Sequence, residues 1–203
     1  MNIICNDCLS GFLYKSLNIQ FNNPFFWSRI YLNDFIRLID RIDTLDLYDF
    51  EIKLNKDYAN IFHLYEIDRL SPVIYLQGIR VFFNHYKYDP SARTPRIKTP
   101  DVYYYRNYEY AVSKYLKRLD RFNKKDIQVI FHWNDLRNDT VEQDIYKLIE
   151  TCITHNYKLI IVSNKVIKTT HPLILTIYDS DVVQKPVEQG AEEHKLKILQ
   201  HFQ

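Results

Sequence analysis

The fold is decided by residues 129–165, which read VIFHWNDLRNDTVEQDIYKLIETCITHNYKLIIVSNK. Two short apolar runs, 129–131 and 159–162, enclose a segment with helical periodicity from about 140 to 155. Asp139 and Glu142 form a capping-box pattern before this helix, and Asn156 fits a left-handed stop after it. Its apolar stripe is Val141, Ile145, Leu148, Ile149 and Cys152. The segment is therefore a βαβ unit, which is nearly always parallel and right-handed.

Two further runs, 3–5 and 81–83, have the composition of strands buried on both faces. Each of the four runs ends in a polar group that contains an asparagine: Asn6-Asp7-Cys8, Asn84-His85-Tyr86, His132-Trp133-Asn134-Asp135 and Ser163-Asn164-Lys165. If the strands are parallel, these groups converge on one edge of the sheet, where open α/β sheets bind their ligands. We predict an α/β fold with three layers, a mostly parallel or mixed sheet, and helices on both faces.

The remaining elements surround this sheet. We predict helices over 9–17, 33–43 (capped by Asn33 or Asp34) and 107–122, and strands over 72–77 and 79–83 joined by a tight turn at Gly78. Residues 44–70 are ambiguous: their first part has a strand-like pattern (Leu47, Phe50, Ile52 and Leu54), whereas the later part suggests a helical turn (Ile61, Leu64, Tyr65 and Ile67). The loop 87–101 contains three prolines and is predicted to act as a mobile lid, with Arg93 and Arg96 facing the polar edge. Residues 1–183 form a single domain, and 184–203 form a loosely attached helical tail.

Composition excludes several classes of protein. The 203 residues carry a net charge of +2, from 27 basic and 25 acidic side chains, so no global field favours nucleic acid. No apolar stretch approaches the roughly 20 residues that span a bilayer, and no secretory signal is visible. Cys5 and Cys152 lie in apolar segments, which indicates buried thiols in a reducing compartment. We therefore expect a cytoplasmic protein without a membrane span.

Three blocks of sequence resemble a bacterial domain-of-unknown-function family that is often labelled exopolysaccharide biosynthesis protein. They are residues 3–14 (IICNDCLSGFLY), extended by Asn23-Pro24-Phe25 and Asp34-Phe35; residues 71–87, from Ser71-Pro72-Val73 to Phe83-Asn84-His85-Tyr86-Lys87; and residues 117–123 (KRLDRFN). The resemblance covers roughly residues 1–165. It implies an α/β fold and a link to surface polysaccharides. Ser10, Phe82 and the tail after 165 depart from the family pattern.

The candidate catalytic residues are His85 and Asp135. His85 combines a group that titrates near neutral pH with a strand-end position and a motif shared with the resembling family. Catalysis requires that both residues reach a common atom. His85→Ala is then expected to lower turnover at least about 100-fold, and Trp133→Ala to weaken substrate binding. The candidate binding residues are Asn6, Asp7, Cys8, Asn84, Tyr86, Arg118, Arg121, His132, Trp133, Asn134 and Asn164.

Each assignment has a structural alternative that stays open. Asn6 or Asp7 can simply cap a helix, Asn134 and Asp135 can satisfy their own backbone, and Arg118 and Arg121 can belong to a solvated helix face. We assign no metal ligands, although His85, His132 and Asp135 could form a set, and Cys8 could be a nucleophile with a histidine base. No glycine-rich phosphate loop is present, so a nucleotide-sugar would be held by side chains.

The leading functional hypothesis is a glycosyl- or other group-transferase of surface-polysaccharide biosynthesis that acts on a sugar or nucleotide-sugar. The first alternative is a non-catalytic module that binds carbohydrate or a partner. The second is a nucleic-acid-associated protein, suggested by basic and aromatic residues at 93–121, against which the low net charge counts. Sequence patterns specify neither a cofactor nor an oligomeric state.

Overall fold

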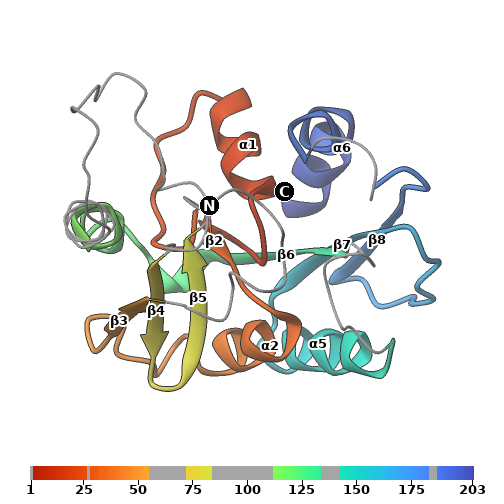
Figure 1. The fold of residues 1–203 in the computed structure, drawn as a ribbon. Coiled ribbons are helices and arrows are strands. Elements are labelled where there is room, and N and C mark those ends of the chain that lie inside the picture. The colour runs from red at the N-terminus through yellow and green to blue at the C-terminus, as the bar shows by residue number, and fades with distance from the viewer. Residues whose placement is uncertain (1, 27, 55–71, 84–111, 134–141, 183–186) are drawn as a thin grey trace.

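A computed structural model describes residues 2–26, 28–54, 72–83, 112–133, 142–182 and 187–203. Its centre is a parallel sheet of four strands in the order β1-β6-β7-β8. These strands are β1 (Asn2–Cys5), β6 (Ile127–Trp133), β7 (Lys158–Ser163) and β8 (Ile174–Tyr178). Figure 1 shows the helices α1 (Leu9–Ser16) and α6 (Val187–Phe202) above this sheet, and α2 (Leu32–Arg41) and α5 (Glu142–Thr154) below it. The predicted three-layer α/β architecture is confirmed.

The βαβ unit at 129–162 has the predicted geometry. Strands β6 and β7 pair in parallel, with Val129 opposite Leu159 and Phe131 opposite Ile161. Ile145, Leu148, Ile149 and Cys152 of α5 are buried, and Asn156 adopts a positive φ of 56° after the helix. The capping residue Asp139 lies outside the described residues.

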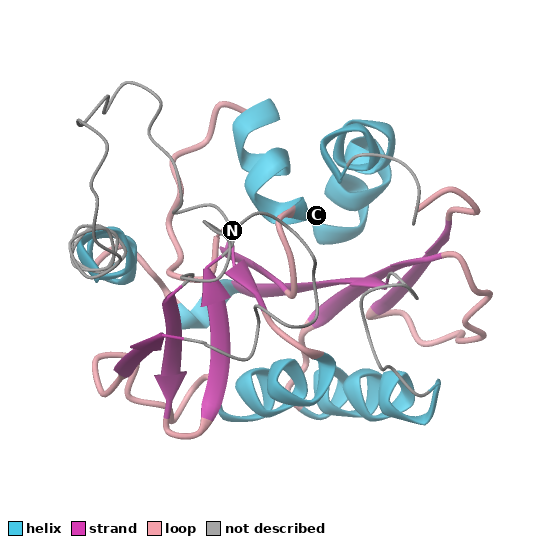
Figure 2. Ribbon diagram, viewed as in Figure 1, coloured by secondary structure: helices cyan, strands magenta, loops and turns pink. Residues whose placement is uncertain are grey.

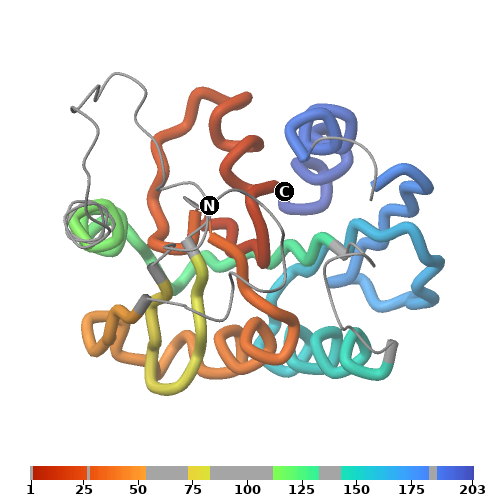
Figure 3. Tube along the Cα trace, in the orientation of Figure 1, coloured from red at the N-terminus to blue at the C-terminus, as the bar shows by residue number. Residues whose placement is uncertain are grey.

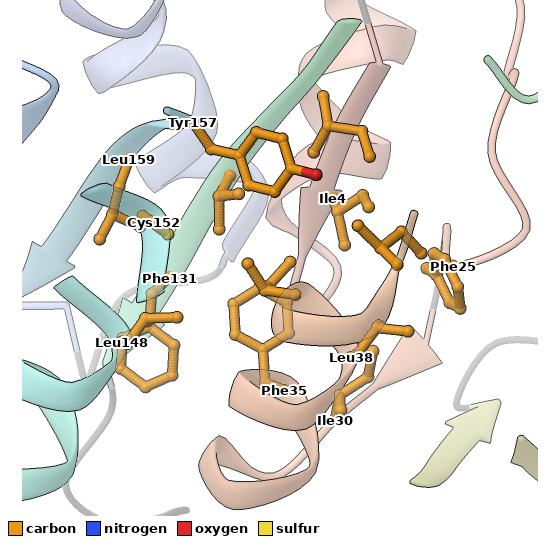
Figure 4. Close-up of a cluster of buried hydrophobic side chains, with 14 of the residues drawn as sticks. Ile4, Phe25, Ile30, Phe35, Leu38, Phe131, Leu148, Cys152, Tyr157 and Leu159 are labelled. Atoms are coloured by element: carbon orange, nitrogen blue, oxygen red, sulfur yellow. The ribbon is translucent and has the colours of Figure 1, made fainter. Parts of the chain in front are cut away.

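Alternate residues of the parallel strands enter two separate cores. Ile4, Val129 and Phe131 belong to the core shared with α2 and α5, part of which is drawn in Figure 4. Ile3, Cys5, Ile130, Val162 and Ile177 belong to the core under α1 and α6. Both faces of the sheet are therefore covered, which explains why its strands appear in the sequence as continuous apolar runs rather than as alternating patterns.

A second, antiparallel sheet has the order β2-β5-β4-β3. Its strands, seen at the left of Figure 2, are β2 (Ser28–Arg29), β3 (Glu51–Leu54), β4 (Pro72–Leu76) and β5 (Ile79–Phe83). The predicted turn between β4 and β5 is confirmed, with positive φ at Gln77 (49°) and Gly78 (87°). A two-residue turn of this kind joins antiparallel neighbours.

This sheet corrects the expectation that the strand at 81–83 shares a sheet with the strands at 3–5, 129–131 and 159–162. Because β5 pairs with β4 and β2, it lies outside the parallel sheet. Its carboxyl end nevertheless approaches that of β1: Phe83 pairs with Ser28, and two residues further on the Ile30 N–H donates to the Asn6 carbonyl at 2.8 Å.

Helix α2 differs at its amino end from the prediction. It begins at Leu32 with Tyr31 as its N-cap residue, so neither Asn33 nor Asp34 caps it. Asp34 is instead buried in the first turn, where it pairs with Arg37 and accepts a 2.9 Å hydrogen bond from Nε of Arg80 in β5. This carboxylate attaches the antiparallel sheet to α2.

The other predicted elements are partly described. Residues 112–119 are helical, and the Tyr115 hydroxyl on this helix donates to the Leu47 carbonyl at 2.9 Å. Helix α6 is not loosely attached: it packs on α1, and Ala191, His194 and Ile198 are buried. The division of the chain at residue 183 stays a prediction. The loop 87–101 lies outside the described residues. Among the described helices, none has the length and apolarity needed to cross a bilayer.

Candidate functional site

Among the predicted site residues, Asn6, His132 and Asn164 mark the carboxyl edge of the parallel sheet, and Asp7 and Cys8 lie between Asn6 and α1. Asn6 follows β1, His132 is the penultimate residue of β6, and Asn164 follows β7. Parallel pairing of β1 with β6 and of β6 with β7 brings these strand ends together (Figure 3). Asn164 carries a buried Oδ1 without a hydrogen-bond partner among the described residues. The polar edge formed by these three residues has a definite geometry around His132.

The Asn6 side chain extends the pairing of β1 with β6 beyond the last residue of β1. Its Oδ1 accepts from the His132 N–H at 2.8 Å, and its Nδ2 donates to the His132 carbonyl at 3.1 Å. The backbone carbonyl of Asn6 also accepts from Ile30, next to β2. Asn6 thus imitates a strand residue and holds β6 and the β2 segment to the end of β1. Both polar atoms of its side-chain amide therefore take part in hydrogen bonds within the protein.

Asp7 and His132 form a buried pair at the same edge. Oδ2 of Asp7 contacts Nδ1 of His132, and their side chains are only 15% and 3% exposed. The other carboxylate oxygen, Oδ1, accepts from the Leu9 N–H at 2.9 Å and faces the Cys5 thiol at 3.4 Å. The structural alternative, that Asp7 only caps a helix, is therefore correct in part. Asp7 accepts a hydrogen bond from the first turn of α1, and it also holds His132.

The pKa of Asp7 lies below its ordinary value. Burial alone would raise it, but the charge of His132, the hydrogen bonds from His132 and the Leu9 N–H, and the Cys5 thiol together lower it. The carboxylate is therefore ionised at neutral pH. A carboxylate on Nδ1 selects the tautomer and orientation of an imidazole, so that Nε2 is the nitrogen available for chemistry. This is the arrangement that a general base requires.

The thiols of Cys5, at the end of β1, and of Cys152, on α5, are poorly suited to nucleophilic attack. Burial, followed by the negative charge of Asp7, raises the pKa of Cys5 well above its usual value, and burial raises that of Cys152 to about 12. The three cysteines are unpaired with one another and buried. A thiol that stays protonated is a weak nucleophile.

We expect Cys5 and Cys152 to be unreactive in the native protein. In a Cys8→Ser variant, which leaves only these two thiols, Ellman's reagent at pH 8 should label neither until guanidinium is added, and then both. Rapid labelling of one thiol under native conditions, with unchanged circular dichroism, would contradict the burial and the raised pKa values.

The two predicted anion-binding arginines have different environments. Arg118 is buried, its Nη1 donates to the Phe26 carbonyl at 3.0 Å, and its guanidinium lies 5.5 Å from the centre of the Phe21 ring. Arg121 is exposed in the turn after the helix. The Arg118 contacts favour a structural role, in which it fastens the 112–119 helix to the 21–26 segment.

The remaining predicted site residues cannot be placed. His85, Asp135, Asn84, Tyr86 and Asn134 lie outside the described residues, as do Arg93 and Arg96. Trp133 is the last residue of β6, and its side chain is likewise outside what the structure describes. The assignments of His85 and Asp135 as catalytic residues stay predictions.

A second buried aspartate–histidine pair was missed in the sequence. Asp179 follows β8, its N–H donates to the Ser163 carbonyl at 2.9 Å, and its Oδ2 lies 2.8 Å from Nε2 of His194 on α6. Residues 173–177 read LILTI before Tyr178-Asp179, which repeats the pattern of an apolar run ending in a polar group. That pattern could have revealed both β8 and Asp179. Nothing local links Asp179 to His194.

Together, the fold and this edge define an α/β protein with a parallel sheet and an aspartate-oriented histidine where such sheets bind ligands. The chain belongs to the family described as domain of unknown function DUF1919, whose profile matches residues 1–103. That match includes β1, Asp7 and the antiparallel sheet, whereas β6 to β8 lie beyond it. No curated protein matches the chain.

Proposed function

We propose that the protein is a cytoplasmic group transferase of surface-polysaccharide biosynthesis, most simply a glycosyltransferase that uses a sugar or nucleotide-sugar at the carboxyl edge of the parallel sheet. The observation that supports this most is the contact between Asp7 and His132, at the ends of two adjacent parallel strands. The resemblance of the 3–14, 71–87 and 117–123 blocks to proteins labelled for exopolysaccharide biosynthesis supports the class of substrate.

In the proposed reaction, His132 acts as the general base. Nε2 accepts the proton of an acceptor hydroxyl while the hydroxyl oxygen forms a bond to the anomeric carbon of the donor. The bond from that carbon to the leaving group breaks at the same time, and the leaving group departs with its electron pair. Asp7 holds the imidazole in position and stabilises the imidazolium that forms, as a carboxylate does for a catalytic histidine. His85 and Asp135 remain the acid/base residues predicted from the sequence.

The first test is a thermal-shift screen of the full chain against nucleotide-sugars and free sugars. A ligand at 100 times its Kd stabilises the folded state by about 2.7 kcal/mol. Nucleotide release from the best ligand is then measured for the wild type and for His132→Gln. We expect His132→Gln to lower turnover at least about 100-fold with an unchanged fold.

The matched control is His155→Gln. His155 also contacts an aspartate, Asp40, at 3.3 Å, but it follows α5 and precedes β7, at the opposite edge of the sheet. It should leave turnover unchanged. If His155→Gln and His132→Gln retain equal turnover, His132 is not the base.

A second candidate is a non-catalytic module that binds carbohydrate or a partner. It is favoured by the small exposure of His132, 4%, and by the complete use of the Asn6 amide for structure. A sugar that stabilises the protein without release of any leaving group, and binds His132→Gln as tightly as the wild type, would establish this function instead.

A further inference from the structure

The Asp179–His194 pair belongs to a larger group of potential ligand atoms. Asp179, Glu193 and His194 each offer one oxygen or nitrogen, and these atoms all lie within 4.8 Å of one another. Asp179 and His194 are buried at 7% and 9% exposure, whereas Glu193 is exposed. Since Asp179 follows β8 and the other two residues lie on α6, the group joins two elements that the DUF1919 profile does not cover.

The carboxylate of Asp179 is held in place by the backbone. Its Oδ1 accepts from the Asp181 N–H at 3.0 Å, and its own N–H donates to the Ser163 carbonyl. These contacts leave Oδ2 directed at Nε2 of His194. Fixed orientation of a ligating carboxylate by neighbouring hydrogen bonds is characteristic of metal sites.

The charge of the group favours a cation. Two carboxylates and one imidazole carry a net negative charge whether His194 is neutral or protonated. Close carboxylates repel one another, and a divalent cation between them removes that repulsion. The neighbouring Lys195 is directed elsewhere: its Nζ donates to the Ser16 carbonyl at 3.2 Å and lies 3.7 Å from Glu192.

We propose that Asp179, Glu193 and His194 bind one divalent transition-metal ion. One imidazole and two carboxylates suit Zn²⁺, Mn²⁺ or Fe²⁺, because these ions accept an imidazole nitrogen as a ligand, whereas Ca²⁺ and Mg²⁺ prefer oxygen ligands. A tetrahedral sphere with bonds of about 2.1 Å separates its ligand atoms by roughly 3.4 Å. The three ligand atoms lie within 4.8 Å of one another, and the exposed Glu193 side chain can rotate to bring its oxygen to the tetrahedral distance. The 2.8 Å contact between Asp179 and His194 must open by about 0.6 Å, and the proton that the two groups share is released when the ion binds.

Three protein ligands leave at least one coordination position for water or a substrate oxygen. Strand register puts this site on the same face of the sheet as His132, because His132 pairs with Val162, Val162 pairs with Ile177, and Asp179 follows Ile177 by two residues. Two strand spacings of about 4.8 Å separate the ends of β6 and β8. The proposal does not depend on the transferase function, since it concerns binding alone.

The test is calorimetric titration of the untagged full chain with Zn²⁺, together with the visible absorption of a Co²⁺-loaded sample. We expect one ion per chain, an absorption band typical of Co²⁺ with nitrogen and oxygen ligands, and a rise in Tm of roughly 5–10 °C at 100 times the Kd. Asp179→Asn should weaken binding at least about 100-fold and Glu193→Gln about 10-fold.

Glu193→Gln is the decisive variant. Because Glu193 is exposed, its loss should leave the Tm of the metal-free protein unchanged while binding falls. Glu192→Gln, one position earlier on α6 and also exposed, is the matched control and should bind as the wild type does. The proposal is wrong if the wild type binds no stoichiometric Zn²⁺, Mn²⁺ or Fe²⁺. It is also wrong if Glu193→Gln and Asp179→Asn bind as tightly as Glu192→Gln; Asp179 and His194 then serve only to hold α6.

Discussion

Phe35→Ala is expected to reduce the free energy of unfolding by about 3–5 kcal/mol. Phe35 lies on the inner side of α2, is completely buried, and places its ring 6.1 Å from that of Phe131 in the centre of the parallel sheet. Figure 4 shows it surrounded by side chains from α2, α5 and the sheet. Truncation leaves a cavity at the point where these elements meet, and rigid neighbours on several sides limit its collapse.

Urea unfolding followed by circular dichroism measures this loss. Tyr146→Ala is the matched control, because it also removes an aromatic ring from a helix but one that is 40% exposed. It should cost less than about 1 kcal/mol. A similar cost for the two substitutions would mean that the core around Phe35 is not packed as described.

Asp7→Ala is expected to cost about 2–3 kcal/mol, the range for loss of a hydrogen bond to a charged group that leaves buried donors unsatisfied. The substitution leaves His132 buried without its carboxylate and the Leu9 N–H without its acceptor. Asp7→Asn should cost less, since an amide oxygen can still accept from Leu9. Both values are measured by urea unfolding at pH 7.

The cost of Asp7→Ala should also depend on pH. The pKa of Asp7 is lower in the folded protein than in the unfolded chain, so its stabilising effect is complete above the unfolded value of about 3.9. The effect is lost as the pH falls from there through the folded value. The difference between wild type and Asp7→Ala should thus shrink as the pH falls below about 4.

Asp46→Ala is the control for Asp7→Ala. Asp46 accepts the Tyr48 N–H at 2.9 Å, as Asp7 accepts that of Leu9, but Asp46 is exposed. Its loss should cost about 1 kcal/mol, the usual net value of one hydrogen bond. If Asp7→Ala costs no more than Asp46→Ala, the pair with His132 contributes nothing to stability.

Much of the fold was predictable because it depends on local patterns. The apolar run at 159–162 marks β7, the stripe from Ile145 to Cys152 marks α5, and the glycine at 78 marks a hairpin turn. A βαβ unit then has one handedness, and its strand ends must lie at one edge. The same reasoning predicts that Asn6, His132 and Asn164 lie together, and the parallel pairing of β1 with β6 and of β6 with β7 brings them to one edge.

The partners of individual side chains were not predictable in this way. The pattern at 81–83 indicates a buried strand, yet the same pattern fits either sheet, and pairing with β2 assigns it to the antiparallel one. Asp34 has the sequence position of a helix cap, but the approach of Arg80 from β5 makes it a buried anchor. Apolar periodicity indicates that a residue is buried, but it does not specify which sheet or helix packs against that residue.

The candidate sites show the same division. Local sequence establishes that Asp7 lies just before a helix, that His132 lies near the end of a strand, and that an apolar run precedes Asp179, because backbone preference and burial act over a few residues. The contacts that determine the chemistry of these groups join Asp7 to His132 across 125 positions, and Asp179 to His194 across 15 positions. Such contacts arise when strand order and helix packing bring distant segments together, and periodicity within one segment carries no information about them.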